Sequence, residues 1–333
     1  VMPTIAWDGC FARCARRVLE LLANTDGGSD SFLVVFDGDP PPPPDWLANS
    51  QARLLATGRR SGPAVARNLA ADSADGEILV FVDADVELHC DAIGRIRWHF
   101  ENDPQLDAVF GSYDDRPTAP GLVSQFRNLL HHHTHSSHAG RASTFWAGCG
   151  AIRRSRFLAL GGFDSCYKRP SIEDIELGMR LAAAGGQLLL DPTILCTHHK
   201  HWSLRSVVVT DIRQRALPWS RLLRRHHHPP VGLNLTPTAR LSGVLTLVLV
   251  ACLITLPWLG LAGWGALACL LALLWLNRSF YRFCMRARGP GFMLGAIPLH
   301  LLYFLYSSLT YGVVAVESWV QPERAPHPAA PTP

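Results

Sequence analysis

The feature that most restricts the fold is a run without a single charged residue from Leu241 to Leu276. Leu-Pro-Trp-Leu-Gly interrupts it at 256–260, and a membrane span requires about 20 apolar residues. The run therefore predicts a tight hairpin of two short helices, or one long helix with an interfacial piece. A further apolar segment at 292–316 supplies another span. We predict a transmembrane region of about three helices at 241–318, followed by a Pro-rich tail at 319–333.

Arginines flank these apolar segments, and Lys168 and Lys200 are the only lysines. Because basic residues are retained on the cytoplasmic side, this pattern places the N-terminal region and the loop after the hairpin in the cytoplasm, with the tail outside. Three spans satisfy this bias, whereas two would require a re-entrant piece. A net charge of +4 without a recognisable binding motif argues against nucleic acid as a partner. The flanking arginines are Arg221, Arg224, Arg225, Arg240, Arg278, Arg282, Arg286 and Arg288.

Residues 1–200 alternate between predicted strands and helices. Residues 31–36 and 77–82 are short apolar runs that predict buried strands, and residues 62–74 have the pattern of a helix. This alternation predicts an α/β domain with a mostly parallel sheet flanked by helices. Residues 201–240 then mix apolar side chains with arginines, which is typical of amphipathic helices on a membrane surface and equally of an ordinary helix at a domain edge.

The nine cysteines are odd in number and scattered, and two lie in the apolar run. This distribution is not typical of a disulfide framework. We expect the thiols to be reduced and mostly structural, in a cytosol-like compartment. The opening apolar stretch is short and Asp8 follows it, so no secretory signal is expected there.

Carboxylates follow both predicted strands. Asp37 and Asp39 end the first strand, and Asp83 and Asp85 end the second. Ligands of open α/β sheets bind beyond the carboxyl ends of strands. A pair at i and i+2 suits Mg²⁺ or Mn²⁺ shared with phosphate oxygens, and the cation would offset charge on a diphosphate leaving group. Acidic residues also end many strands without such a role, and an isolated Asp-x-Asp favours that simpler interpretation.

A further carboxylate lies at the start of a predicted helix. Ser171 followed three residues later by Asp174, before an apolar-periodic run, predicts a capping box. Asp174 is then either a helix cap or the general base for an acceptor hydroxyl, and the two interpretations weigh evenly. Glu173 would share the capping or orienting work.

Two other segments have both a functional and a structural interpretation. Arg67 is placed one turn into a helix, where it would reach a phosphate or pair with a carboxylate at the sheet edge. Trp146 precedes Gly148-Cys149-Gly150, which suits close approach of a ligand or a tightly packed turn.

Histidines form two dense clusters, at 131–138 and at 226–228. Neither has a Cys or acidic partner at zinc-site spacing, so adventitious metal binding is the expectation for both. His198 and His199 instead follow an apolar run and are predicted to face the site from another strand end.

Taken together, the order and spacing of these motifs resemble glycosyltransferase family 2, whose catalytic domain has the GT-A fold. The resemblance covers most of residues 1–225. It implies nucleoside contacts by Asp37, ribose and metal–diphosphate contacts by Asp83 and Asp85, and Asp174 as the catalytic base of an inverting transfer. The implied cofactor is Mg²⁺ or Mn²⁺. The donor-binding set is Asp37, Asp39, Arg67, Asp83 and Asp85.

Membrane-bound members, including ceramide glucosyltransferase-like enzymes, carry Gln-x-x-Arg-Trp where this chain has 198–202. Trp202 agrees, His198 stands for the Gln and His201 for the Arg, which argues against processive synthesis. The residues expected to line the acceptor side are Trp146, Gly148, Cys149, Gly150, Glu173, His198, His201 and Trp202.

The resemblance implies transfer of a sugar from a UDP- or GDP-sugar to a lipid or lipid-linked acceptor, at the cytoplasmic face of a bacterial inner membrane. One alternative is a nucleotidyltransferase, although the Gly-rich, Lys-bearing loop usual near its start is not seen. The other is a membrane scaffold with a decayed catalytic domain, against which the presence of Asp83, Asp85 and Asp174 argues.

Overall fold

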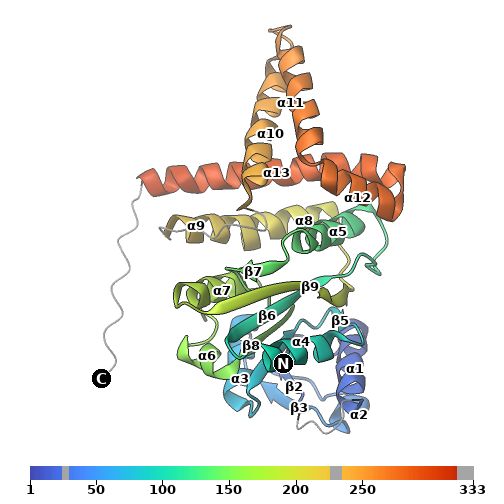
Figure 1. Cartoon of the computed structure of the whole chain (residues 1–333), viewed down its shortest axis with the longest axis vertical. Helices are drawn as coiled ribbons and strands as arrows, with labels where there is room; N and C mark the ends of the chain where they lie inside the picture. The colour runs from blue at the N-terminus through green and yellow to red at the C-terminus, as the bar shows by residue number, and fades with distance from the viewer. Residues whose placement is uncertain (25–29, 226–234, 321–333) are drawn as a thin grey trace.

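The computed structural model describes residues 1–24, 30–225 and 235–320. The histidine cluster at 226–228 and residues 321–333 of the tail lie outside the described residues. Figure 1 shows a layered molecule, with a sheet domain at one end and two helices, α10 (Pro237–Thr255) and α11 (Ala262–Leu276), projecting from the other.

The first part of the sheet is parallel. It consists of β1 (Met2–Thr4), β2 (Leu33–Phe36) and β3 (Arg53–Ala56). Val1 joins it to β4 (Ile78–Val82), because the Val1 nitrogen donates to the Val80 carbonyl at 2.7 Å and the Val1 carbonyl accepts from the Val82 amide at 3.0 Å. In a parallel strand pair, one residue forms hydrogen bonds to the residues on either side of the one that faces it. Val1 bonds to Val80 and Val82 in this way, so β4 lies parallel to the first group of strands.

The second part of the sheet is mixed. Its β6 and β9 are parallel, whereas β8 is antiparallel to β4 and β6, and β5 and β7 are antiparallel to β9. The α/β class with flanking helices is thus confirmed, but the prediction of a mostly parallel sheet is wrong here. Apolar runs identify strands, whereas the connections between them set strand direction. The strand order is β4, β8 (Cys149–Arg153), β6 (Leu106–Tyr113), β9 (Gln187–His198) and β5 (Val86–Leu88), with β7 (Gly140–Ala142) beside β9.

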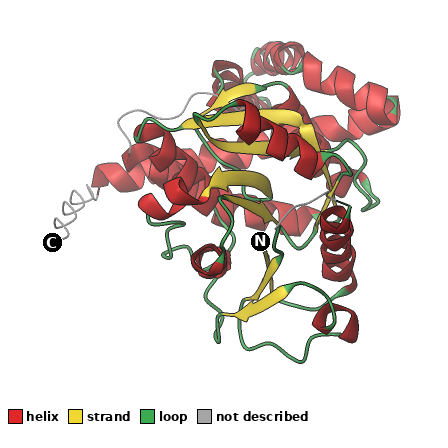
Figure 2. Ribbon diagram, turned by 60° about the horizontal axis from the view of Figure 1, so that its bottom comes forward, coloured by secondary structure: helices red, strands yellow, loops and turns green. Residues whose placement is uncertain are grey.

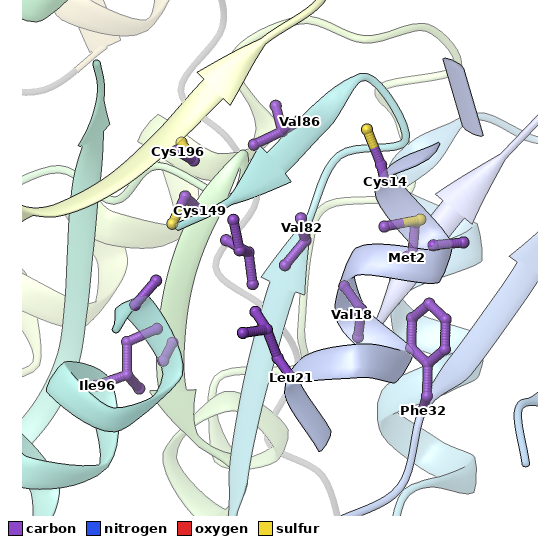
Figure 3. Close-up of a cluster of buried hydrophobic side chains, with 14 of the residues drawn as sticks. Met2, Cys14, Val18, Leu21, Phe32, Val82, Val86, Ile96, Cys149 and Cys196 are labelled. Carbon is purple, nitrogen blue, oxygen red and sulfur yellow. The ribbon is translucent and has the colours of Figure 1, made fainter. Parts of the chain in front are cut away.

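Helices cover the sheet on both sides, as Figure 2 shows. One apolar core lies between the strands and α1 and α4, and Figure 3 shows part of it, with Val18 and Leu21 of α1 facing Val82 of β4. A second core lies under α3, α6 and α7 and contains Phe81 and Phe157. These cores fix the strand ends on which the site stands. The helices are α1 (Gly9–Ala23), α2 (Asp45–Ala48), α3 (Pro63–Ser73), α4 (Ala92–Asn102), α5 (Leu122–Ser136), α6 (Arg154–Ala159) and α7 (Glu173–Ala183).

The rest of the described chain is helical. A layer of α8 (Leu204–Thr210), the π-helical turn η1 (Asp211–Ala216) and α9 (Leu217–Arg225) lies against the sheet domain (Figure 1). The α10–α11 pair packs side by side, and α12 (Arg278–Arg288) and α13 (Pro290–Val320) follow. By length and composition α10 and α13 are each able to cross a membrane, and α11 with α12, bent by 66°, would make a third span at most.

Candidate active site

A cavity of about 1640 Å³ opens where the strand ends meet the helical layer. It contains most of the residues predicted to form the site. Asp39 and His201 are exposed and do not line it, and neither do Gly148, Cys149 and Gly150. The predicted residues that do line it are Asp37, Arg67, Asp83, Asp85, Trp146, Glu173, Asp174, His198 and Trp202.

Asp37, at the end of β2, is buried and organises the loop before α3. Its carboxylate accepts hydrogen bonds from the Ser61 amide at 2.7 Å, the Gly62 amide at 3.0 Å and the Thr57 hydroxyl at 3.1 Å. Gly62 has φ +94°, and a Cβ there would lie 2.7 Å from the Lys168 backbone. This position therefore requires glycine, and Asp37 holds its backbone against the loop that precedes α7.

Asp83 and Asp85 extend from the end of β4 into the cavity, with about a third of each side chain exposed. Asp83 accepts from Arg67 at 2.6 Å, and Nε2 of His198 lies 3.6 Å from Asp85. Burial would raise the pKa of Asp85, but the His198 hydrogen bond and the charge of Lys200 outweigh it, so that pKa lies below its usual value and the carboxylate is ionised.

Asp83 and Asp85 suit a divalent cation whose other ligands come from a bound phosphate compound and water. Both side chains are about one third exposed and line the cavity. Among the described residues, no group of three or more His, Cys, Asp and Glu stands close enough to hold a metal alone. A hard cation bound by one or two carboxylates takes its other ligands from phosphate and water, which is the arrangement that these residues permit.

Arg67 is buried between two carboxylates. It donates to Asp83 at 2.6 Å and to Glu173 at 3.0 Å, while its Nε has no partner in the described structure. Burial alone would lower its pKa, but the charges of Asp83 and Glu173 raise it above the usual value, so the guanidinium stays charged. In the structure Arg67 thus pairs with carboxylates, and a contact between Arg67 and a phosphate stays a prediction.

Asp174 lies in the first turn of α7, but the predicted capping box is wrong. The helix begins at Glu173, and its N-cap Ile172 makes no side-chain bond. The Ser171 hydroxyl instead donates to the Gln214 carbonyl at 2.9 Å, because η1 packs over this end of α7. Asp174 therefore forms no capping box with Ser171. Its carboxylate instead accepts hydrogen bonds from the backbone amides of Ala147 and Ile175, at 3.0 and 2.8 Å.

The environment of Asp174 raises the pKa of its carboxyl group. Burial, and then the negative charge of Glu173, raise its pKa to about 7, against the opposing effects of the amide bonds and Arg67. A carboxylate with a pKa near neutrality accepts a proton far more readily than an ordinary aspartate does. The general-base interpretation is the one that this geometry favours.

The glycine-rich segment after Trp146 is a tightly packed turn. A Cβ on Gly148 would lie 2.5 Å from the Trp146 ring, and one on Gly150 would lie 2.3 Å from the Trp146 carbonyl. Cys149 is fully buried in the core. Their prediction as site-lining residues is therefore wrong, because they face the core and hold Trp146, which does line the cavity.

Aromatic and histidine rings form one wall of the cavity. The ring of His198 stacks on that of Tyr113, with 4.3 Å between the ring centroids and 6° between the planes. The ring centroids of Tyr113 and His131 are 4.3 Å apart, and those of His131 and His135 are 4.0 Å apart. Burial lowers the pKa of His131 well below its usual value and that of His135 to about 4, so both rings are neutral. His131, His135 and His138 of the 131–138 cluster thus line the cavity, and the i, i+4 spacing of His131 and His135 was the available signal. His132 and His133 instead stack on Phe283.

Sequence reasoning missed a polar group on the far side of the cavity. Asp211 of η1 accepts from Arg127 and Arg215, both at 3.1 Å, and from the Tyr306 hydroxyl at 2.5 Å. The group connects α5, η1 and α13, so no local motif could have revealed it. It lies where the cavity passes from the sheet domain to α10 and α13.

An α/β sheet with carboxylates at successive strand ends and a further one at a facing helix start is the GT-A architecture of glycosyltransferases. Residues 10–160 match the family described as Glycosyl transferase family 2. The match covers less than half of the chain, and it confirms the resemblance drawn from the motifs.

Solved structures agree with the fold. The mannosyltransferase PcManGT from Pyrobaculum calidifontis, solved with GDP-Man and Mn²⁺, aligns with a TM-score of 0.52 and 17% identity, over 97% of this chain and 86% of that one. GalNAc-T7, solved with UDP, GalNAc and Mn²⁺, aligns at a TM-score of 0.45 and 16% identity over 63% of this chain and 47% of that one. The first of these likenesses supports the GT-A fold.

Among characterised sequences, polypeptide N-acetylgalactosaminyltransferase 4 from Mus musculus is 27% identical over 182 residues. The match covers 47% of this chain and 30% of the mouse protein. The chain thus spans less than a third of the length of this relative.

Proposed function

We propose that the protein is a metal-dependent, inverting glycosyltransferase that moves a sugar from a nucleotide-sugar donor to a lipid or lipid-linked acceptor. The observation that carries this proposal is the continuity of the cavity. It extends from Asp83, Asp85 and Asp174 to Val244 and Leu247 of α10 without interruption. A site that is carboxylate-lined at one end and apolar at the other suits a polar donor and an amphipathic acceptor.

At the donor end, Asp83 and Asp85 would hold Mg²⁺ or Mn²⁺ on the donor diphosphate, where the cation supplies charge stabilisation for the leaving group. Arg67 holds Asp83 in place through their ion pair. Asp37 lies beside the loop before α3, where we place the nucleoside. The Mn²⁺ and GDP-Man in the solved mannosyltransferase PcManGT support a donor of this class.

In the transfer step, the Asp174 carboxylate takes the proton of an acceptor hydroxyl. The hydroxyl oxygen forms a bond to the anomeric carbon as the bond from that carbon to the diphosphate breaks, and the nucleoside diphosphate leaves. Attack opposite to the leaving group inverts the anomeric centre. The pKa of Asp174, raised to about 7, keeps a useful fraction ionised at neutral pH while making it an effective proton acceptor.

The membrane assignment is part of the same proposal. The apolar helices, and the arginines at their base, support a catalytic domain at the cytoplasmic face of a bacterial inner membrane, where nucleotide sugars are available. The acceptor then enters the cavity from the lipid between α10 and α13, and its reactive hydroxyl meets Asp174.

The proposal is tested by incubating membranes that contain the protein with a panel of UDP- and GDP-sugars, with Mn²⁺ or Mg²⁺ and with EDTA. We expect one donor to give a new glycolipid by mass spectrometry of the lipid extract, and EDTA to abolish it. A product that carries a nucleotidyl group would instead identify a nucleotidyltransferase. Absence of any metal-dependent nucleotide-sugar binding by calorimetry would favour a non-catalytic scaffold.

A further inference from the structure

Helix α13 packs against the sheet domain and its helical layer along most of its length. Near its start, Gly295 contacts α5 so closely that an added Cβ would lie 2.8 Å from a leucine there. In the middle, Tyr306 donates to Asp211 of η1, and near the end Glu317 pairs with Arg221 of α9 at 3.2 Å. A helix of this length extends about 45 Å. Contacts at both ends and in the middle therefore require α13 to lie along the domain, as Figure 1 shows.

Helix α13 places large apolar side chains on its outward face as well as against the protein. The face turned toward the protein buries Ala296, Phe304 and Val314 together with the polar side chains of His300, Tyr306 and Thr310. The outward face exposes Leu309 at 52% and Trp319 at 88%. A helix with an exposed apolar face requires an apolar medium or partner outside the protein to cover that face.

The α10–α11 hairpin projects from the base that α13 forms (Figure 1). Its surface is apolar, with Leu261 exposed at 83% and Trp264 at 73% near the turn. At 1.5 Å per residue α10 is about 28 Å long and α11 about 22 Å, against about 30 Å for the hydrocarbon core of a bilayer. The hairpin is thus able to enter the core and return, with its shorter arm falling short of a full crossing.

Basic residues surround the base of the hairpin. α12 buries Phe280 and Tyr281 against the protein and carries Arg282 and Arg286 on its other side. Its bend of 66° from α11 turns it away from the hairpin axis. Arginines at this level match the anionic headgroups of a phospholipid surface.

We infer that the α10–α11 hairpin inserts into a phospholipid bilayer and returns through the same face, while α12 and α13 lie in the lipid–water interface. The inference rests on the proposed membrane association and differs from the three-span expectation. Three spans would carry the end of α13 to the far side, whereas an interfacial α13 keeps Val320 on the same side as the catalytic domain.

The side on which the chain ends is the first test. The full chain is expressed in a bacterium with either a fluorescent protein or alkaline phosphatase fused after Pro333, and the phosphatase on a secreted carrier is the positive control. We expect a fluorescent fusion and an inactive phosphatase, because both reporters stay in the cytoplasm. An active phosphatase would overturn the inference in favour of a spanning α13.

The depth of the two apolar helices is the second test. Val248→Arg places a charge in the middle of α10, and Leu309→Arg places one near the middle of α13; both positions are exposed, at 43% and 52%, so neither disturbs the interior. Binding of the purified proteins to phosphatidylcholine–phosphatidylglycerol liposomes is measured by flotation. Because an arginine is far more costly in the hydrocarbon core than at the interface, we expect Val248→Arg to reduce the bound fraction about tenfold and Leu309→Arg less than about twofold.

Equal losses in the two variants would show that α13 lies as deep as the hairpin, and unchanged binding of Val248→Arg would show that the hairpin does not insert. Either result would refute the inference. Neither measurement depends on sugar transfer. A protein that is inactive on every donor but gives the expected flotation and fusion results would refute the proposed function and leave this topology standing.

Discussion

The donor end and the acceptor end of the cavity are built in different ways. At the donor end, Asp37, Asp83 and Asp85 stand on strand termini held by two apolar cores, so backbone geometry places them. At the acceptor end, side chains from α5, η1, α10 and α13 converge, and Asp211 holds three of those elements together. The donor end is therefore fixed by the fold, whereas the acceptor end depends on how the helical layer docks.

The largest effect is expected where the two ends meet. Asp174→Asn removes the proton acceptor but keeps the shape of the side chain and one of its two amide contacts, because asparagine has a single acceptor oxygen. We expect kcat for transfer to fall by about 10²–10⁴-fold, with donor binding by calorimetry unchanged. Asp39→Asn is the matched control, because Asp39 follows the same sequence pattern yet is exposed and outside the cavity. Full activity of Asp174→Asn, or a comparable loss in Asp39→Asn, would contradict the assignment.

The second prediction separates the two ends. Asp211→Asn leaves the Arg127 charge without its partner and loosens the contact between η1 and α13. We expect kcat/KM for the acceptor to fall about tenfold to a hundredfold, equivalent to about 1.4–2.8 kcal/mol. Hydrolysis of the donor in the absence of acceptor should stay within about twofold, since the donor end is fixed independently.

Its control is Glu317→Gln, which removes an exposed ion pair between α13 and α9. Exposed pairs contribute little, so this variant should retain acceptor kinetics. If Asp211→Asn weakened donor binding as strongly as acceptor use, the two ends would not be independent and the comparison would fail.

Histidines supply the third prediction. His198 is buried, stacks on Tyr113 and faces Asp85, whereas His201 is exposed and outside the cavity. We expect His198→Gln to lower kcat/KM for the donor about tenfold, because it removes the imidazole that stacks on Tyr113 and faces Asp85 at 3.6 Å. His201→Gln should remain within about twofold of the parent. Equal losses in the two variants would instead support the hypothesis from the sequence, in which His198 and His201 replace the Gln and Arg of the Gln-x-x-Arg-Trp motif.

The donor end was largely predictable from the sequence, because each of its carboxylates follows a local apolar run. Asp37, Asp83 and Asp85 were found in this way, and strand termini place such residues at one edge of the sheet. The same rule also selected Asp39, since a sequence pattern does not record which residue of a turn faces the ligand. The capping box failed for a related reason: Ser171 is occupied by η1, a contact between residues far apart in the sequence.

The acceptor end was not predictable, because its residues meet through tertiary packing. Asp211 and Tyr306 are separated by 95 positions, and neither lies in a recognisable motif. Hydrophobicity correctly identified α10 and α13 as apolar helices, but it does not record their directions. Direction follows from contacts such as that between Glu317 and Arg221, which no composition reveals.

The smallest effect is expected in the pH profile, and it tests the coupling between Glu173 and the base. The Glu173 carboxylate helps to raise the pKa of Asp174 to about 7, so activity should rise with pH through about that value as Asp174 loses its proton. In Glu173→Gln the negative neighbour is gone, the ionised base is less disfavoured, and the acid limb should move down by about one unit or less.

The shift is measured from the pH profiles of kcat for the parent protein and Glu173→Gln. We expect the variant to show a few-fold higher relative activity near pH 6. Glu176→Gln is the control, because Glu176 pairs with Arg180 on the same helix and does not line the cavity. An unchanged limb in Glu173→Gln would mean that burial alone sets the pKa of Asp174. A limb that moves up would mean that the loss of the Glu173–Arg67 pair displaces the positive charge that helps to keep Asp174 ionised, and the base would then depend on the donor end as much as on its own helix.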